Sequence, residues 1–234
     1  MTRRTLGGAQ QPMVKNLFVG TPKNLTGSSV LSAIERNPVA ALSVGFDAIA
    51  GDLVADPEHH GGRNRVLHQY PLEHYAVWGT RYPGIEFSAG GMGENLTSAG
   101  CTEDTVCIGD LFRIGSVRCV VTEPRKPCAT IDVRYRIKGL ARRVQEECRT
   151  GWFYRIISEG AIEIGDAITL LERPYPRLTL AVCVRALLLA PDRETLERMA
   201  SNPVLSHDWR QPARELLSTG TLADDRKRLG DASP

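Results

Sequence analysis

Short apolar segments bounded by turn residues dominate the chain between residues 14 and 175. This pattern predicts strands over 14–19, 39–44, 111–114, 117–121 and 168–171. Gly115 and Ser116 separate the third segment from the fourth and predict a tight hairpin, because glycine accepts the positive φ that such turns need. Only 71–78 and about 140–148 suggest helices in this part of the chain. The pattern therefore predicts a mainly β domain with a few helices.

The pattern changes after residues 173–176, where two prolines within three residues resist both helix and central strand. Residues 178–189 form a nearly continuous apolar run, and Asp192 and Ser206 are placed to cap two further helices. We therefore expect a small three-helix C-terminal module over 177–218. Its apolar first helix must be buried, either against the β domain or in a homodimer interface.

The two ends of the chain lack apolar periodicity. Residues 1–13 are polar and rich in glycine, and residues 219–234 carry charges without an apolar stripe. Both are expected to be disordered tails. The domain between them, residues 14–176, has many short strands entered after Gly-Asp turns, which favours a β-barrel.

The composition argues against a membrane-spanning protein and against a protein that binds large polyanions. The chain is 42% hydrophobic and 24% charged, and no run approaches the length of a membrane span. Residues 1–13 show no apolar signal segment, so a cytoplasmic location is expected. The 29 Lys and Arg residues against 27 Asp and Glu give a net charge of +2, which argues against a nucleic-acid polymer or an acidic membrane as partner.

A polar segment at residues 52–70 is the densest candidate for chemistry, and four of the five histidines lie within 59–74. Three interpretations stay open. The segment is a polar loop, a metal site made by His60, His68 and a carboxylate, or an anion site. In the anion site, the backbone of Gly61 and Gly62 would approach a phosphate and Arg63 or Arg65 would neutralise it. The HExxH spacing is absent.

Residues 89–96 form a second, glycine-rich cluster that is not in the GxGxxG register of a dinucleotide loop. Three glycines within four residues indicate a bend or a close backbone approach. Glu94 and Asn95 place polar groups beside that bend.

Cys128 stands apart from the other five cysteines. It follows a predicted strand through a loop with two prolines, and the adjacent Arg125 and Lys126 favour the thiolate. No CxxC pair exists, and the other cysteines are expected in the core. Cys128 is therefore a candidate functional thiol. Close behind it, residues 149–155 are dense in aromatic and cationic side chains and form either core or the wall of a flat-ligand pocket.

Taken in order, these clusters resemble the MOSC family, and specifically its YiiM-like branch. The similarity rests on Asp56-x-x-x-His60-Gly61-Gly62, Leu67-His68-x-Tyr70-Pro71-x-Glu73-His74-Tyr75, Gly93-Glu94-Asn95-Leu96, Arg125-x-Pro127-Cys128, Thr150-Gly151-Trp152-x-Tyr154-Arg155 and Leu205-Ser206-x-x-Trp209-Arg210. The likeness covers about residues 14–217. At Asp47 the chain departs from the glycine expected in this branch.

The resemblance implies a MOSC-type β-barrel that binds the molybdenum cofactor, with Cys128 as the ligand of molybdenum. It implies candidates for binding the pterin and its phosphate, and these are His60, Arg65, Glu94, Asn95, Arg125, Trp152, Tyr154 and Arg155. It also implies reduction of N-hydroxylated compounds, such as base analogues, by cleavage of the N–O bond. His60 or Glu94 would then be the proton donor, and an external reductase would supply electrons. A carrier of the cofactor or of sulfur that uses Cys128 without turnover is the alternative.

Overall fold

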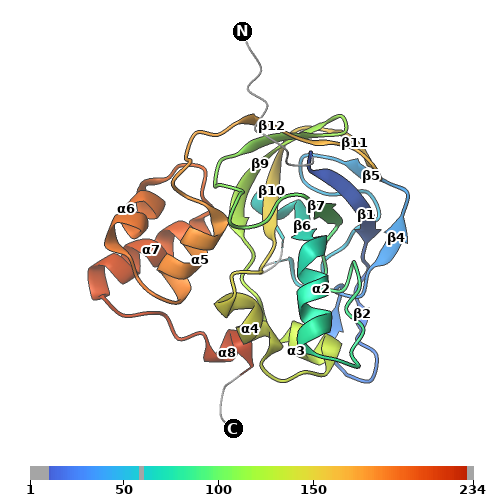
Figure 1. The fold of residues 1–234 in the computed structure, drawn as a ribbon, viewed down its shortest axis with the longest axis horizontal. Coiled ribbons are helices and arrows are strands. Elements are labelled where there is room, and N and C mark those ends of the chain that lie inside the picture. Colours follow the sequence, from blue (N-terminus) through green and yellow to red (C-terminus); the bar gives the residue numbers. More distant parts are fainter. Residues whose placement is uncertain (1–10, 58–60, 231–234) are drawn as a thin grey trace.

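The computed structural model describes residues 11–57 and 61–230. The strands are β1 (Met13–Val19), β2 (Lys23–Asn24), β3 (Leu31–Ser32), β4 (Asn37–Val39), β5 (Ala41–Val44), β6 (Leu67–Pro71), β7 (Leu96–Ala99), β8 (Leu111–Ile114), β9 (Val117–Pro124), β10 (Trp152–Ser158), β11 (Gly160–Glu163) and β12 (Ile168–Glu172). The helices are the 3-10 turn η1 (Arg63–Arg65), α2 (Leu72–Arg81), α3 (Thr130–Tyr135), α4 (Leu140–Glu146), α5 (Leu180–Leu188), α6 (Arg193–Ser201), α7 (His207–Thr219) and α8 (Arg226–Leu229). The mainly β prediction is confirmed (Figure 1).

An eight-stranded sheet forms the body of the molecule, in the order β12-β8-β9-β10-β6-β7-β1-β4. All neighbours are antiparallel except β6 and β7, which are parallel. The predicted hairpin joins β8 to β9, and Gly115 at its turn has a φ of 57°. The hairpin could be predicted because the turn residues and both strands are adjacent in sequence.

The sheet does not close into the expected barrel. Its outer strands are β12 and β4, and β4 takes one edge of β1 from Leu17 onward. Only the start of β1 can therefore reach the other end of the sheet, through an isolated bridge between Met13 and Ala167. The predicted strand over 39–44 is also divided, because β4 pairs with β1 whereas β5 pairs with β11 in a separate two-stranded sheet.

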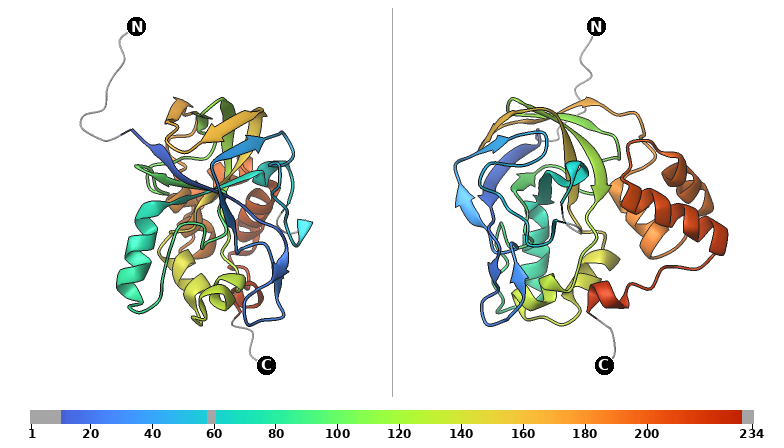
Figure 2. Two further views of the ribbon diagram at one scale, coloured as in Figure 1. Left: turned by 90° about the vertical axis from the view of Figure 1, so that its right-hand side faces the viewer. Right: turned by 180° about the vertical axis from the view of Figure 1, so that it is seen from behind.

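Helices α5, α6 and α7 pack against one another beside the sheet (Figures 1 and 2). Thr179 caps α5 and Asp192 caps α6 through their side chains, but Ser206 precedes α7 without a side-chain cap. The apolar face of α5 is buried in the same core as the sheet. The apolar run that suggested a homodimer is thus covered within the chain. Among the described residues, no helix is long and apolar enough to cross a membrane.

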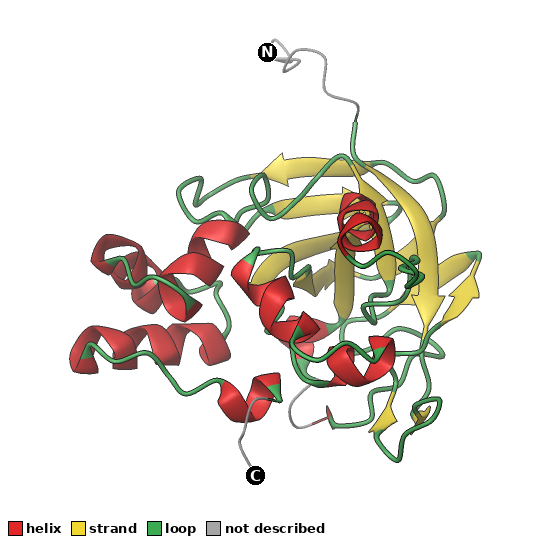
Figure 3. Cartoon of the chain, turned by 60° about the horizontal axis from the view of Figure 1, so that its bottom comes forward, coloured by secondary structure: helices red, strands yellow, loops and turns green. Residues whose placement is uncertain are grey.

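A second, smaller core lies where α2, α3 and α4 gather at one end of the sheet (Figure 3). Leu229 of α8 is completely buried in it. The prediction that 219–234 is disordered is therefore wrong for residues 226–229, which form α8. A single buried leucine among charged residues produces no apolar periodicity, so the sequence pattern could not reveal this helix.

Candidate functional site

A cavity opens where the loops before β6, before β7 and after β9 meet the segment between β3 and β4. Side chains that carry chemistry line it, namely Arg36, Asp52, Arg65, His68, Asn95, Arg125, Cys128 and Phe153. These residues come from segments far apart in the sequence. Of the predicted site residues, the fold brings Arg65, Asn95, Arg125 and Cys128 together here.

Cys128 is the accessible thiol of the protein. It is partly exposed on the cavity wall, whereas the other five cysteines are buried. Burial raises the pKa of the Cys101 thiol to about 11, and it raises the pKa of Cys119 and of Cys183 further. The buried thiols are therefore protonated and inert at neutral pH. The carbonyl oxygen of Cys128 accepts a hydrogen bond from the N–H of Ile131 (3.0 Å), so this thiol stands just before α3.

The cavity is cationic, but two of its three arginines are paired with carboxylates. Arg36 forms an ion pair with Asp52 in which both side chains are nearly buried. Arg65 forms ion pairs with Glu123 of β9 and with Asp208 of α7, the latter at 2.5 Å. The positive charge of each of these two guanidinium groups is thus offset within the protein.

Arg125 differs from the other two arginines. Its Nη1 donates to the carbonyl oxygen of Met92 (2.9 Å), and among the described residues no carboxylate lies within ion-pair distance of it. Arg125 therefore supplies positive charge that the surrounding residues do not offset. A guanidinium in this state is suited to bind an anion.

His68 lies beside this arginine and is buried. Its Nδ1 faces the carbonyl oxygen of Gly93 (3.1 Å), and because a carbonyl can only accept, Nδ1 carries the proton. Burial, followed by the charge of Arg125, holds the pKa of His68 well below 6.5. The ring is therefore neutral, with an Nε2 lone pair that has no hydrogen-bond partner among the described residues. The ring of Phe153 stacks on it with a centroid separation of 4.7 Å.

Asn95 fixes the geometry of the cavity wall. Its backbone N–H donates to the carbonyl oxygen of His68 (2.9 Å), and its Oδ1 accepts from the N–H of His68 (3.1 Å). Its Nδ2 donates to Asp52 Oδ2 (3.0 Å). Asn95 thus joins the histidine to the Arg36–Asp52 ion pair, and its side chain has little capacity left for a ligand.

Glu94 does not line the cavity. It is completely buried, and its Oε1 accepts from the Tyr75 hydroxyl (2.6 Å), the Gly90 N–H (2.7 Å) and the Thr97 hydroxyl (3.1 Å). The glycine-rich segment folds closely around this carboxylate. The close approach expected from its glycines is real, since a Cβ on Gly91 would lie 2.0 Å from the Tyr135 hydroxyl oxygen. These contacts support a structural role for Glu94.

The aromatic side chains of β10 divide between two faces. Trp152 and Tyr154 are completely buried in the core, and the Tyr154 hydroxyl donates to Gln69 Oε1 (2.7 Å). Phe153, between them, lines the cavity. Successive side chains of a strand point to opposite faces, so 153 is the aromatic position that can form a wall. Arg155 donates to Asn64 Oδ1 (3.3 Å) and is outside the cavity lining.

Among the lining residues that carry chemistry, Arg36, Asp52 and Phe153 were not singled out as site residues, and His68 was considered only as a metal ligand with His60. His68 and Asp52 were visible in the polar segment, and the alternation of β10 could have selected Phe153. Nothing in the sequence distinguishes Arg36. His60, the remaining predicted residue, lies outside the described residues. Within residues 11–57 and 61–230, no group of three or more His, Cys, Asp or Glu side chains could hold a metal ion.

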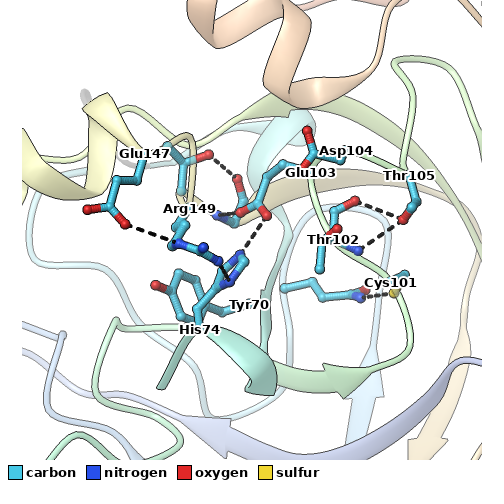
Figure 4. Close-up of polar contacts among 12 residues, drawn as sticks. Tyr70, His74, Cys101, Thr102, Glu103, Asp104, Thr105, Glu147 and Arg149 are labelled. Carbon is cyan, nitrogen blue, oxygen red and sulfur yellow. Dashed lines mark hydrogen bonds and ion pairs between the residues drawn. The ribbon is translucent and has the colours of Figure 1, made fainter. Parts of the chain in front are cut away.

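A second cluster of charged groups, outside the cavity lining, is made by His74, Glu103 and Arg149 (Figure 4). His74 Nε2 donates to Glu103 Oε2 (2.6 Å), and Arg149 Nη1 donates to His74 Nδ1 (3.0 Å). Both His74 and Glu103 are almost completely buried. The arrangement fixes the tautomer of His74, because Nδ1 accepts from a guanidinium that can only donate.

This cluster reaches the cavity through Gly151. Glu103 Oε1 accepts from the Gly151 N–H (2.6 Å), and the Gly151 carbonyl oxygen accepts from the Arg125 N–H (3.0 Å). Gly151 has a φ of +70°, and a Cβ there would lie 2.9 Å from His68 Nε2. Glu103 therefore holds a backbone position that binds the N–H of Arg125 and that has room beside His68 only because residue 151 is glycine.

Comparison with known proteins gives consistent matches. A protein-family model described as "MOSC domain" matches residues 56–169. The "Protein YiiM" of Escherichia coli (strain K12) is 31% identical over 183 residues, which cover 77% of this chain and 82% of that protein. A Gibberella moniliformis protein named "Reductase" is 36% identical over 162 residues, which cover 66% of this chain and 28% of that longer protein.

The solved structures agree with the sequence matches. The crystal structure of YiiM from Geobacillus stearothermophilus is similar with a TM-score of 0.75 and 30% sequence identity. The match covers 88% of this chain and 99% of that one. The likeness therefore extends over most of this chain.

Proposed function

Because this chain belongs to the MOSC domain family, in its YiiM-like branch, we propose that it is a molybdenum-cofactor-dependent oxidoreductase that reduces N-hydroxylated compounds by cleaving the N–O bond. The single observation that carries the proposal is the position of Cys128. It is a partly exposed thiol on the wall of a cavity that also contains Arg125. A relative named "Reductase" supports the oxidoreductase class.

The residues present fit the cofactor. A thiolate is a suitable ligand for a soft or highly covalent metal centre, and Cys128 is the one accessible thiol among the six cysteines. Arg125, with no carboxylate bound to it in the described part of the chain, is suited to the phosphate of the pterin. Phe153 lines the cavity and stacks on His68, so it offers an apolar wall for a heterocyclic ring.

When bound, the cofactor supplies the two-electron chemistry that the side chains cannot perform. The chain supplies the environment for that chemistry. Cys128 would hold the metal, Arg125 and Arg65 would bind the anionic part, and Asn95 keeps the cavity wall in place. His68 is buried and neutral, so it does not deliver a proton.

Protonation of the leaving oxygen needs an acid near the substrate. Of the two candidates, Glu94 is completely buried, accepts three hydrogen bonds through Oε1 and lies outside the cavity lining, which leaves His60 as the proposed donor. His60→Ala is then expected to lower kcat for an N-hydroxylated substrate more than it raises KM. Unchanged turnover in His60→Ala would remove this role. An external reductase is proposed as the source of electrons.

The first test is the molybdenum and pterin content of protein purified from a host that makes the cofactor. We expect near-stoichiometric molybdenum in the native chain and little in Cys128→Ala, whereas Cys148→Ala, at a buried thiol, keeps its metal. Absence of both molybdenum and pterin from the folded native chain would refute the assignment. Retention of the cofactor with no turnover of N-hydroxylated compounds would instead favour the carrier function.

A further inference from the structure

The last helix of the chain returns to the cysteine loop, which we define as residues 124–129. After α7 the chain runs to α8, the last helix of the described residues, which lies next to α4 (Figure 1). There the Ala129 N–H donates to the carbonyl oxygen of Arg228 (2.8 Å), and the Arg228 guanidinium donates to the carbonyl oxygen of Pro127. One residue thus binds the backbone on both sides of Cys128.

Arg228 is itself held firmly. Its Nη2 donates to Gln145 Oε1 (2.7 Å) and forms an ion pair with Asp225 (2.7 Å). Gln145 Nε2 donates in turn to Asp225 Oδ2 (3.2 Å), so the three side chains form a closed ring of contacts. The ring ties α8 to α4, which makes Arg228 a fixed support for the cysteine loop.

The two residues after Arg228, Leu229 and Gly230, determine how closely α8 packs against the cysteine loop. Leu229 is completely buried in the smaller core, where Ile131 and Val144 also lie. Gly230 has a φ of +76°, and a Cβ there would lie only 3.0 Å from the Cβ of Ala129. The glycine thus lets the end of α8 lie closer to Ala129 than a residue with a side chain could.

The contacts restrain three consecutive backbone positions. The carbonyl of Pro127 and the N–H of Ala129 are bound by Arg228, and the carbonyl of Cys128 is bound by the N–H of Ile131. The ring of Pro127 also fixes the φ of that residue. We propose that Arg228 is a positioning residue that holds the Cys128 thiol on the cavity wall for ligation of the metal. This inference rests on the proposed function only for the identity of the ligand.

The rate of alkylation of Cys128 by iodoacetamide tests the proposal in protein without cofactor, because the other five cysteines are buried. Removing the anchor increases transient opening of the loop. In Arg228→Ala we expect the alkylation rate, measured by intact mass, to rise about fivefold or more. Arg226→Ala is the matched control, since Arg226 is on the same helix but its guanidinium is bound only to Asp224 among the described residues, and its rate stays at the native value.

A second variant separates the effect of loop opening on the alkylation rate from the effect of losing the positive charge of Arg228. Arg228→Ala also removes a cation, which by itself disfavours the thiolate and slows the reaction. Arg228→Lys keeps the charge but cannot bind Pro127 and Gln145 together as the planar guanidinium does, so its rate is also expected to rise. A pH series for each variant gives the limiting rate of the thiolate, and Arg228→Lys decides the question if Arg228→Ala does not fold.

The outcomes distinguish this inference from the proposed function. A rise in limiting alkylation rate in both Arg228 variants, with reduced molybdenum per chain, supports it. A limiting rate equal to the native one, or faster alkylation with unchanged molybdenum content, overturns the positioning role. If the native chain carries no molybdenum, the proposed function fails, and the alkylation rates still decide whether Arg228 holds the loop.

Discussion

Arg125→Ala is the substitution that most directly tests the electrostatics of the cavity. The guanidinium of Arg125 donates to one backbone carbonyl and, in the described part of the chain, is bound to no carboxylate. Removing Arg125 therefore removes positive charge that nothing else offsets. Removing Arg65, by contrast, deletes a charge that Glu123 and Asp208 already offset. The two variants should differ strongly in anion affinity although both change an arginine of the same cavity.

The size of the effect follows from the contacts. A hydrogen bond to a charged group contributes about 1.5 to about 3 kcal/mol, which corresponds to an increase in Kd of roughly tenfold to roughly 100-fold. For Arg65→Ala the expected increase is less than about tenfold, because the guanidinium donors of Arg65 already bind Glu123 and Asp208, and the buried Glu123 left behind can take up a proton. Folding should be affected little in Arg125→Ala, since one hydrogen bond to Met92 contributes about 1 kcal/mol.

Calorimetric titration with inorganic pyrophosphate measures these affinities on cofactor-free protein. Arg113→Ala is the control, because Arg113 is an exposed arginine of β8 that does not line the cavity. Arg125→Lys should give an intermediate Kd, since it keeps the charge and loses the fork of donors. An unchanged Kd in Arg125→Ala, or a larger loss in Arg65→Ala than in Arg125→Ala, would refute the reasoning.

Three further predictions concern the stability of the folded protein at Glu103, Gly151 and His68. Glu103→Gln replaces the carboxylate that accepts from His74, so it should lower the free energy of unfolding in urea by about 2 kcal/mol, and a change near zero would contradict the assigned contacts. Gly151→Ala meets a backbone oxygen at 2.6 Å and should cost more than about 3 kcal/mol, whereas Gly84→Ala, also at positive φ but with open space around it, should cost about 1 kcal/mol. Burial lowers the pKa of His68 in the folded chain, so below about pH 6.5 the unfolded chain binds a proton that the folded chain does not. The free energy of unfolding should therefore decrease as the pH is lowered, by up to about 1.4 kcal/mol per pH unit. His68→Gln should remove that slope, and an equal slope in urea titrations of both proteins would contradict it.

Local chemistry explains which elements could be predicted from the sequence. The β8–β9 hairpin and the cap of α6 at Asp192 depend on residues within a few positions of each other, and both are confirmed. Closure of the sheet depends on whether β1 meets β12, which are about 150 residues apart. No local pattern encodes that β4 takes the edge of β1 instead.

The aromatic cluster at 152–154 shows a different kind of limit. The residue types predicted either core or the wall of a pocket, and the strand contains both, because Trp152 and Tyr154 are core and Phe153 is wall. The period of two residues in a strand would have separated them, but it required knowing which face of β10 is buried. That information comes from the pairing of β10 with β6 and β9.

Anion binding depends on the net charge that the cavity presents to a ligand. This charge was the hardest property of the site to predict from the sequence. Motifs identified Arg65 and Arg125 as equivalent candidates, and no pattern pointed to Arg36. Their difference arises from partners that lie far away in sequence, such as Asp208, which is 143 residues from Arg65. Since Asp208 is at the start of α7, the helical module after the sheet decides how much of the charge of Arg65 reaches a ligand. The module therefore contributes a charge partner to the cavity, which its apolar pattern, predicting only burial of its first helix, did not indicate.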